Sequence, residues 1–266
     1  MQVRFCGVRG SVPWATPTAI GHGCNTPCLQ VTDERTGALL ILDAGSGIVG
    51  AALQGPPREI PLLLTHYHWD HLQGLPFFSA LYESGWEPTI YAPALATHDP
   101  GWLGTIFRSP FFPVPYDQLP NRPAVRVIDS GQLRIGPFEI ASMMLNHPGG
   151  AYAYRLRGDV GDLVFATDHE FGEPEYDEAL GEFVKDAAAL VLDAHFTPEE
   201  MPRHRGWGHS DWRTGAQFAA AHNVGGLYLF HHKPGRTDQE LVRIRTDARR
   251  IFEATETASE GDALQL

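Results

Sequence analysis

Short apolar runs recur along the chain, and glycine, proline or other turn residues bracket most of them. This pattern is typical of β-strands separated by turns. It predicts strands at residues 3–8, 29–31, 39–42, 62–64, 125–128, 138–145, 151–156, 163–166, 190–192 and 227–230.

Apolar positions with helical spacing lie between several of these runs. They predict helices at residues 46–53, 75–83, 174–185, 211–222 and 238–252. Ser210 or Asp211 would cap the fourth helix and Thr237 or Asp238 the fifth, because their side-chain oxygens can accept from the first helical amides. Strands interspersed with helices indicate a layered α/β domain, and we expect one domain over residues 1–266.

Two stretches depart from this pattern. Residues 101–123 combine several prolines with aromatic side chains, which is unusual inside a compact domain. We expect either a lid, a pocket wall or a homodimer contact there, or an ordered loop that fills a groove on its own domain. Residues 254–266 are polar, and we expect this tail to fray.

The composition, with 43% hydrophobic and 20% charged residues, describes a globular protein. No apolar run approaches the roughly 18 residues that a membrane span needs. The first residues resemble a strand rather than a signal peptide, so we expect a cytoplasmic protein with no membrane partner. The formal net charge of −12 repels polyanions, which argues against nucleic acid as a partner.

The clearest chemical signal is the stretch His66-Tyr67-His68-Trp69-Asp70-His71, which directly follows an apolar run. Alternate side chains at a strand end face the same way, so His66 and His68 share one side. The turn that follows lets Asp70 and His71 face a second centre. Imidazole and carboxylate groups suit zinc, manganese or iron, and the stretch therefore predicts metal binding.

This H-x-H-x-D-H stretch resembles the signature of the metallo-β-lactamase superfamily, and further motifs follow in the family's order. They are Leu42-Asp43-Ala44-Gly45-Ser46-Gly47, Asn146-His147-Pro148-Gly149-Gly150, Ala166-Thr167-Asp168, Asp193-Ala194, Gly208-His209-Ser210 and Leu229-Phe230-His231-His232. The resemblance covers nearly the whole chain. It implies the α/β fold of this family, a four-layer αββα sandwich.

The resemblance also implies two divalent metal ions, either zinc or manganese, with iron as an alternative. One ion would be bound by His66, His68 and His147, the other by Asp70, His71 and His231, and both by Asp168. We favour His231 over His232 because the next residue along a strand points elsewhere. Asp43 would orient the histidine stretch rather than bind metal.

The Gly208-His209-Ser210 element is similar to the branch that contains tRNase Z and the phosphoribosyl cyclic phosphodiesterases. His209 is the candidate general acid there, and Asp70 the other residue we place in catalysis. A helix beginning at Ser210 would fix where His209 points. The alternative is a surface histidine beside Trp207.

We therefore expect a phosphodiesterase acting on a small-molecule phosphodiester, including cyclic ones. A nuclease of the tRNA 3′-processing type is one alternative, and a lactone, thioester or β-lactam hydrolase is another. Asn25 and Thr26 would bind substrate oxygens or simply form a turn. Lys233 would contact phosphate or lie in an exposed loop.

Overall fold

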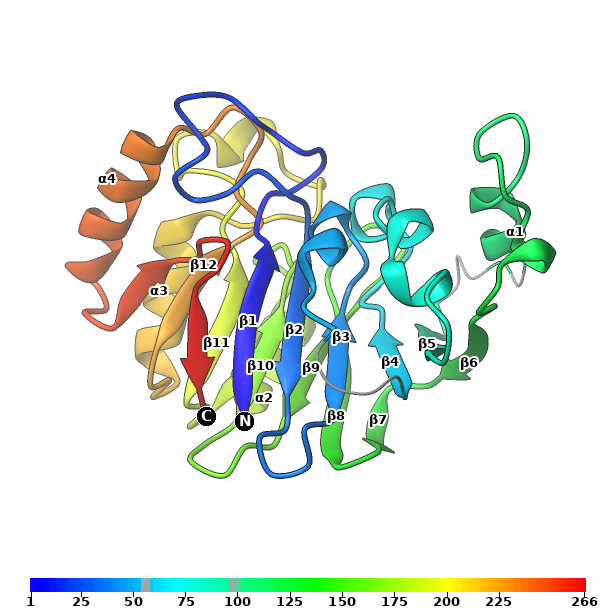
Figure 1. The fold of residues 1–266 in the computed structure, drawn as a ribbon. Helices are drawn as coiled ribbons and strands as arrows, with labels where there is room; N and C mark the ends of the chain where they lie inside the picture. Colours follow the sequence, from blue (N-terminus) through cyan, green and yellow to red (C-terminus); the bar gives the residue numbers. More distant parts are fainter. Residues whose placement is uncertain (54–57, 96–98, 100) are drawn as a thin grey trace.

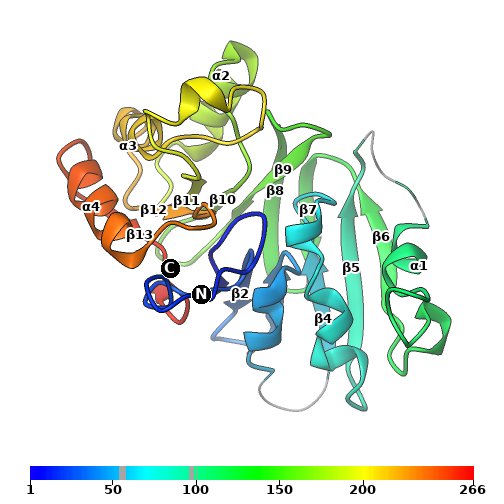
Figure 2. The ribbon, with the colours of Figure 1, turned by 90° about the horizontal axis from the view of Figure 1, so that it is seen from above.

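The computed structural model describes residues 1–53, 58–95, 99 and 101–266, and their strands form two seven-stranded sheets. The first sheet has the order β14-β1-β2-β3-β4-β5-β6, and the second has the order β13-β12-β11-β10-β9-β8-β7. The sheets pack face to face with helices outside them (Figure 2). Both chain ends lie side by side at one end of the strands (Figure 1), where the Met1 amine donates to the Leu266 carbonyl at 2.5 Å.

The strands of the first sheet are β1 (Gln2–Gly7), β2 (Cys28–Thr32), β3 (Leu39–Leu42), β4 (Glu59–Leu63), β5 (Glu87–Pro93), β6 (Ala124–Ile128) and β14 (Ala263–Gln265). Those of the second are β7 (Gly131–Ile135), β8 (Phe138–Leu145), β9 (Ala151–Leu156), β10 (Leu163–Ala166), β11 (Ala189–Asp193), β12 (Leu227–Phe230) and β13 (Thr255–Thr257).

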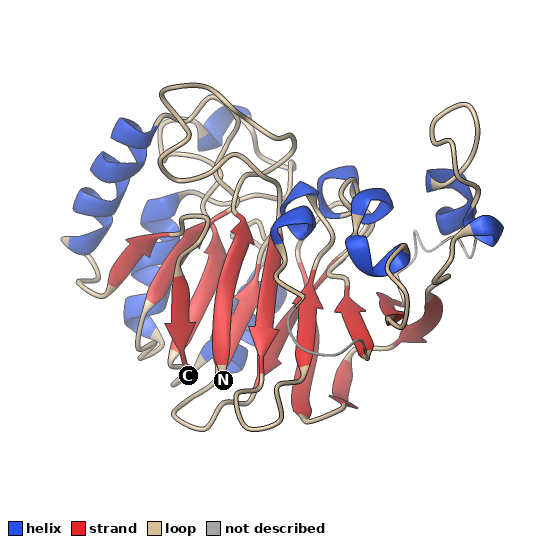
Figure 3. Ribbon diagram, in the orientation of Figure 1, coloured by secondary structure: helices blue, strands red, loops and turns tan. Residues whose placement is uncertain are grey.

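The alternation of side chains along each strand divides the core into three layers. In β3, Leu40 and Leu42 face the apolar cluster between the two sheets, whereas Leu39 and Ile41 face the cluster outside the first sheet. In β12, Phe230 faces inward, while leucines of the same strand face the cluster outside the second sheet. Both sheets are therefore apolar on both faces, and the predicted αββα four-layer sandwich is confirmed (Figure 3).

Three α-helices cover the second sheet: α2 (Pro174–Val184), α3 (Trp212–Ala221) and α4 (Asp238–Arg249). Asp211 caps α3 by accepting from two backbone amides. Thr237 caps α4, and Glu240 returns a bond to the Thr237 amide to complete a capping box. These helices and caps confirm three of the five predicted helices. Within the described residues, every helix is too short or too polar to cross a membrane.

The two other predicted helices are instead short 3₁₀ turns on the outside of the first sheet. The first, predicted at residues 46–53, is the turn η1 (Ser46–Gly50). The second, predicted at residues 75–83, is the pair of turns η3 (Leu75–Phe77) and η4 (Ser79–Leu81), and a further turn, η2 (Trp69–His71), precedes them. Gly47 packs so closely on β1 that a Cβ would lie 2.6 Å from the Cys6 carbonyl oxygen. Pro76 within η3 and the extended backbone of Phe78 prevent one continuous helix over residues 75–83.

The expectation that residues 254–266 fray is wrong. Strand β13 pairs in parallel with β12, and β14 pairs antiparallel with β1. Ala258, between them, is buried in the core between the sheets. Local polarity did not indicate order here because these short strands are stabilised by the sheet edges that they cover.

Residues 101–123 form the short helix α1 (Trp102–Ile106) and the turn η5 (Tyr116–Gln118), and β6 begins directly after them. Trp102, Phe107 and Leu119 are buried in the cluster outside the first sheet. This packing matches the ordered-loop alternative. Phe111 is 74% exposed, and the homodimer contact stays a prediction.

Candidate metal centre

The strand directions bring the predicted site residues to one edge of the sandwich. Strands β3 and β4 are parallel, as are β10, β11 and β12, and β8 runs with β10 because both are antiparallel to β9. His66 and His147 follow the ends of β4 and β8, and Asp168 and His231 those of β10 and β12. Asp168 and His231 both have a positive φ, which turns the chain immediately after its strand.

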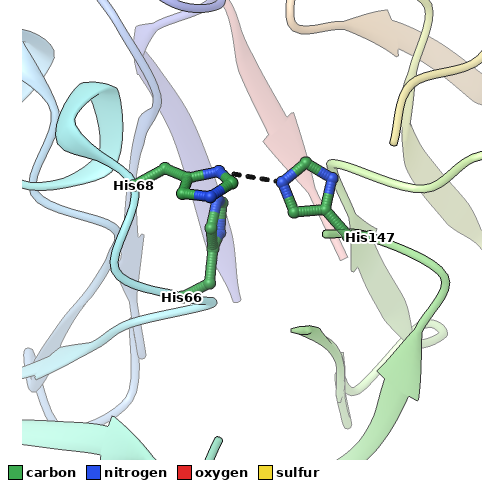
Figure 4. A group of neighbouring side chains, drawn as sticks. All are labelled: His66, His68 and His147. Atoms are coloured by element: carbon green, nitrogen blue, oxygen red, sulfur yellow. Dashed lines mark hydrogen bonds between the residues drawn. The ribbon is translucent and has the colours of Figure 1, made fainter. Parts of the chain in front are cut away.

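Three histidines from both halves of the sandwich meet at this edge (Figure 4). His68 Nδ1 lies 2.9 Å from His147 Nε2. The His66 ring lies 4.5 Å from that of His68 and 4.9 Å from that of His147, between ring centres. His66, His68 and His147 thus present nitrogens to one common point.

A second group lies beside the first. His231 Nε2 is 3.1 Å from Asp70 Oδ2, and His71 Nε2 is 3.6 Å from the same oxygen. Asp168 separates the two groups: its carboxylate oxygens lie 3.8 Å from His147 Nε2 and 3.2 Å from His71 Nε2. The structure therefore brings all seven predicted ligand residues together, with Asp168 between the two groups.

This arrangement fits divalent cations. Two donors bound to one zinc ion at about 2.0–2.1 Å must lie within about 4.2 Å of each other. The donor-atom separations above, from 2.9 Å between His68 and His147 to 3.8 Å between His147 and Asp168, meet that limit. The buried His66 Nε2 has no hydrogen-bond partner within the described chain. Unpartnered buried nitrogens are costly unless something else satisfies them, and a cation would do so.

Two buried residues, Asp43 and Thr65, fix the orientation of the candidate ligands His71 and His66. Asp43 Oδ2 lies 2.8 Å from His71 Nδ1, and Asp43 Oδ1 accepts from the Thr65 amide at 2.8 Å. The Thr65 hydroxyl lies 3.0 Å from His66 Nδ1. Asp43 is fully buried and orients the histidine stretch, as expected. Thr65 was not anticipated, because a threonine before a histidine carries no distinctive signal.

Two further supports come from the backbone of distant loops. The Ser11 amide donates to Asp70 Oδ2 at 2.7 Å. His147 Nδ1 lies 2.8 Å from the Gly208 carbonyl oxygen and donates to it, which leaves Nε2 available as a ligand. Backbone groups have no side-chain signature, so sequence reasoning missed both contacts.

The protonation states suit metal binding. Burial opposes charge on Asp168, but His231 and His71 outweigh it and hold the pKa of this carboxyl well below its usual value. Burial lowers the pKa of His147 to about 4, so its ring is neutral. Burial also opposes charge on His71, but the surrounding aspartates raise its pKa well above the usual value. A cation would displace that proton.

His209 stands next to both groups. Its Nδ1 lies 2.7 Å from Asp193 Oδ2 and 3.7 Å from Asp168 Oδ1. Burial opposes its charged form, but Asp193 and Asp168 outweigh this and raise the pKa of His209 to about 9. Asp193 is fully buried at the end of β11, and its pairing with His209 was not anticipated. The alternative of a free surface histidine is excluded by this pairing.

The two histidines at the end of β12 point in different directions. His231 faces Asp70 and Asp168, whereas His232 Nε2 lies 2.9 Å from the Ala258 carbonyl oxygen on the far side of the strand. The structure therefore places His231, and not His232, among the seven candidate ligand residues. We call this group, which consists of His66, His68, Asp70, His71, His147, Asp168 and His231, the cage.

The three predicted substrate contacts have structural partners instead. Thr26 is fully buried, and its hydroxyl accepts from the Ser46 amide. The Asn25 side-chain amide donates to Glu260. These contacts match the turn-forming alternative, and a buried Thr26 cannot reach a substrate.

Lys233 pairs with Glu200, with 2.9 Å between Nζ and Oε1. Burial opposes charge on Glu200, but the bond from Lys233 and others from Thr197 and Arg236 lower its pKa to about 2. The ammonium group is thus already neutralised, and the structure does not support the predicted contact with phosphate.

Known proteins resemble this chain over its whole length. The profile of the family described as "Beta-lactamase superfamily domain" matches residues 40–232. A ribonuclease Z of Bradyrhizobium sp. (strain ORS 278) is 28% identical over 317 aligned positions, which cover 100% of this chain and 99% of that protein. The alignment is longer than this chain, so the relative has segments without a counterpart here.

Two solved structures share the fold. A diphosphatase from the PhnP family has a TM-score of 0.71 at 16% identity, covering 100% of this chain and 97% of that one. The short form of human tRNase Z has a TM-score of 0.66 at 18% identity, covering 100% and 99%. The expected superfamily is therefore confirmed.

Proposed function

We propose a function from one premise: the chain belongs to the beta-lactamase superfamily domain family. It is a metal-dependent hydrolase, and the bond we propose that it cleaves is a phosphodiester in RNA, as in ribonuclease Z. The relative of that name spans the whole chain, which supports this alternative better than the small or cyclic phosphodiester that we expected first.

One observation carries the proposal: the cage of seven ligand residues with the His209–Asp193 pair at its side. We propose that His66, His68 and His147 hold one divalent ion, that Asp70, His71 and His231 hold a second, and that Asp168 contacts both. Bound divalent cations supply a Lewis acid for the phosphoryl oxygens and a nucleophilic water.

The chain's own residues supply the rest of the chemistry. Asp193 fixes the His209 ring from one side through a 2.7 Å contact with Nδ1. The same contact makes Nδ1 the donor to Asp193, so His209 can deliver a proton from its other nitrogen to the leaving oxygen. The Ser11 amide holds Asp70, and Asp43 holds His71. The cage therefore keeps its geometry while negative charge develops on the leaving oxygen.

A cleavage assay tests the proposal. Purified protein loaded with zinc or manganese is incubated with a precursor tRNA that carries a 3′ trailer, with chelator-treated protein as the control. We expect one endonucleolytic cut at the trailer, and its loss after chelation. His209→Ala should slow the cut by about 100-fold or more, since general acid catalysis contributes about that much. No cleavage of the precursor tRNA with either metal would refute the proposal.

A small phosphodiester is the second candidate, and a specific observation favours it. The net charge is −12, and the aligned ribonuclease Z has segments that this chain lacks. RNA-binding surfaces are normally basic. Hydrolysis of bis(p-nitrophenyl) phosphate and cyclic nucleotides without cleavage of the precursor tRNA would select this candidate.

A further inference from the structure

The carboxylate of Glu170 lies nearly buried beside the metal centre and accepts from backbone amides. Its Oε2 accepts from the Gly206 amide at 2.9 Å and from the Gly208 amide at 2.8 Å, and its Oε1 also lies 2.9 Å from the Gly206 amide. Glu170 is 8% exposed, and its ion pair with Arg205 is long, at 3.9 Å between Oε1 and Nη1. A buried carboxylate is costly unless its oxygens accept hydrogen bonds, so the two glycine amides stabilise it.

The loop that Glu170 binds adjoins two functional groups of the site. The Gly208 carbonyl oxygen lies 2.8 Å from Nδ1 of His147, whose ring faces the other two histidines in Figure 4. The next residue along the chain is His209. A Cβ at Gly208 would lie 2.2 Å from His147 Nδ1, so the loop and this ring are in close contact. A displacement of the loop would therefore move both His147 and His209.

The backbone of Glu170 is tied to the same place. Its amide donates to the Asn146 carbonyl at 2.9 Å, and the Asn146 side-chain amide donates to the Glu170 carbonyl at 2.7 Å. Asn146 directly precedes His147, and Glu170 follows Asp168 by two residues. Glu170 thus joins the segments that carry His147, Asp168 and His209, which leave three different parts of the second sheet and its helices.

We propose that Glu170 is a positioning residue: through the loop of residues 206–208 it fixes the His147 ring in the cage and the backbone that carries His209. Small displacements of such groups lower the rate strongly, which gives a fixed loop its value. The inference rests on the proposed function where it concerns His209. Where it concerns His147, it rests on the cage alone.

A role for the charge of Glu170 is the alternative that the test must separate. Glu170 lines a cavity of about 620 Å³, together with Glu173 and Arg205, so loss of its charge would also change the field in that cavity. Glu173 is exposed and its side chain does not cap α2. Glu173→Gln is therefore a matched control, because it removes the same charge from the cavity wall and leaves the loop untouched.

Zinc affinity tests the link to His147 without any turnover, by competition with a chromogenic chelator. We expect Glu170→Ala to bind one of two zinc ions about 10–100-fold more weakly, the usual cost of losing a partner that orients a metal ligand. Glu170→Asp should resemble it, because its carboxylate is one methylene shorter and cannot reach both glycine amides. Glu170→Gln should lose less, since its oxygen can replace Oε2, and Glu173→Gln should bind zinc as wild type does.

Leaving-group dependence tests the link to His209. The substrates are the phenyl and p-nitrophenyl esters of thymidine 5′-monophosphate, at saturating zinc. Phenolate is the more basic leaving group and needs the proton more, so Glu170→Asp should lower kcat more for the phenyl ester, with KM little changed. In a His209→Ala background the same substitution should leave the ratio of the two rates unchanged, because the proton donor is already absent. A general structural defect would lower both rates equally.

Three results would each overturn the proposal: wild-type zinc affinity in Glu170→Ala, equal losses for the two esters, or a larger loss in Glu170→Gln than in Glu170→Asp. Circular dichroism identifies the folded variants, and if Glu170→Ala does not fold, the comparison of Glu170→Asp with Glu170→Gln decides. If wild type hydrolyses neither ester, the zinc measurement alone decides whether Glu170 positions His147. The cleavage assay with precursor tRNA decides separately on the proposed function.

Discussion

Asp43→Asn replaces one buried oxygen of the metal centre by an amide nitrogen and changes nothing else in size. Asp43 has φ 60°, a conformation that asparagine tolerates well, so the backbone has no reason to move. The substituted side chain can keep the bond from the Thr65 amide through its remaining oxygen. Its NH₂ group then occupies the position 2.8 Å from His71 Nδ1, where the wild-type carboxylate accepts a proton.

Two donors now face each other, and the simplest relief is a change of tautomer in His71. The proton moves from Nδ1 to Nε2, so Nδ1 accepts from the new amide and Nε2 can no longer bind a cation. Removing such supporting carboxylates typically costs 10–100-fold in metal affinity or activity. This corresponds to about 1.4–2.7 kcal/mol of binding free energy. The loss should fall on the ion that we assign to Asp70, His71 and His231.

Metal affinity is measured by competition with a chromogenic chelator, and the stoichiometry by elemental analysis. We expect the Asp43→Asn variant to keep its circular dichroism spectrum and to lose one of two zinc ions at chelator concentrations that wild type withstands. Asp159→Asn, an exposed position, is the matched control and should behave as wild type. Wild-type affinity in a folded Asp43→Asn variant would refute the role of Asp43 in holding His71.

Three further predictions concern the loops and the tail. Gly208→Ala would place a Cβ 2.2 Å from His147 Nδ1, so it should lower the metal content, whereas Gly206→Ala has a similar φ but no atom within 4 Å and should retain metal. Glu200 has its pKa lowered to about 2, so it stabilises the fold above its unfolded value near 4.5, and the stabilisation is lost as the pH falls toward 2. Urea unfolding at pH 6 and pH 3 should show that Glu200→Gln removes on the order of 1–3 kcal/mol of this pH dependence, and an unchanged dependence would contradict it. Deleting residues 263–266 removes β14, one of the two strands that pair with β1, and should lower the free energy of unfolding by on the order of 2–4 kcal/mol. An unchanged urea midpoint would show that the tail contributes nothing.

The apolar pattern of the chain was sufficient to predict most of the strands and the three longest helices. Alternation in β3 and helical spacing in α3 are local properties, and the burial of each face follows from them. Strand β5 was not predicted, because its two prolines interrupt the apolar run. It is nevertheless a strand, since it pairs with both β4 and β6, next to the edge of the first sheet.

In the candidate metal centre, too, some residues could be predicted from the sequence and others could not. His66, His68, Asp70 and His71 lie within six residues, so their spacing alone pointed to a metal, and family resemblance supplied the more distant ligands. No spacing rule connects Asp193 with His209, or the Ser11 amide with Asp70.

What the sequence determined by itself is therefore local: which segments extend or coil, and where one dense group of ligands follows a strand. The tertiary structure decided which of the remaining polar groups meet, because their partners come from the ends of different strands. It also decided which of them lie out of reach, as the fully buried Thr26 does. The tertiary structure also decided that the short tail strands form, since their backbone hydrogen bonds depend on the edges of the sheets. The edge that β14 covers is β1, which lies more than 200 residues earlier in the chain.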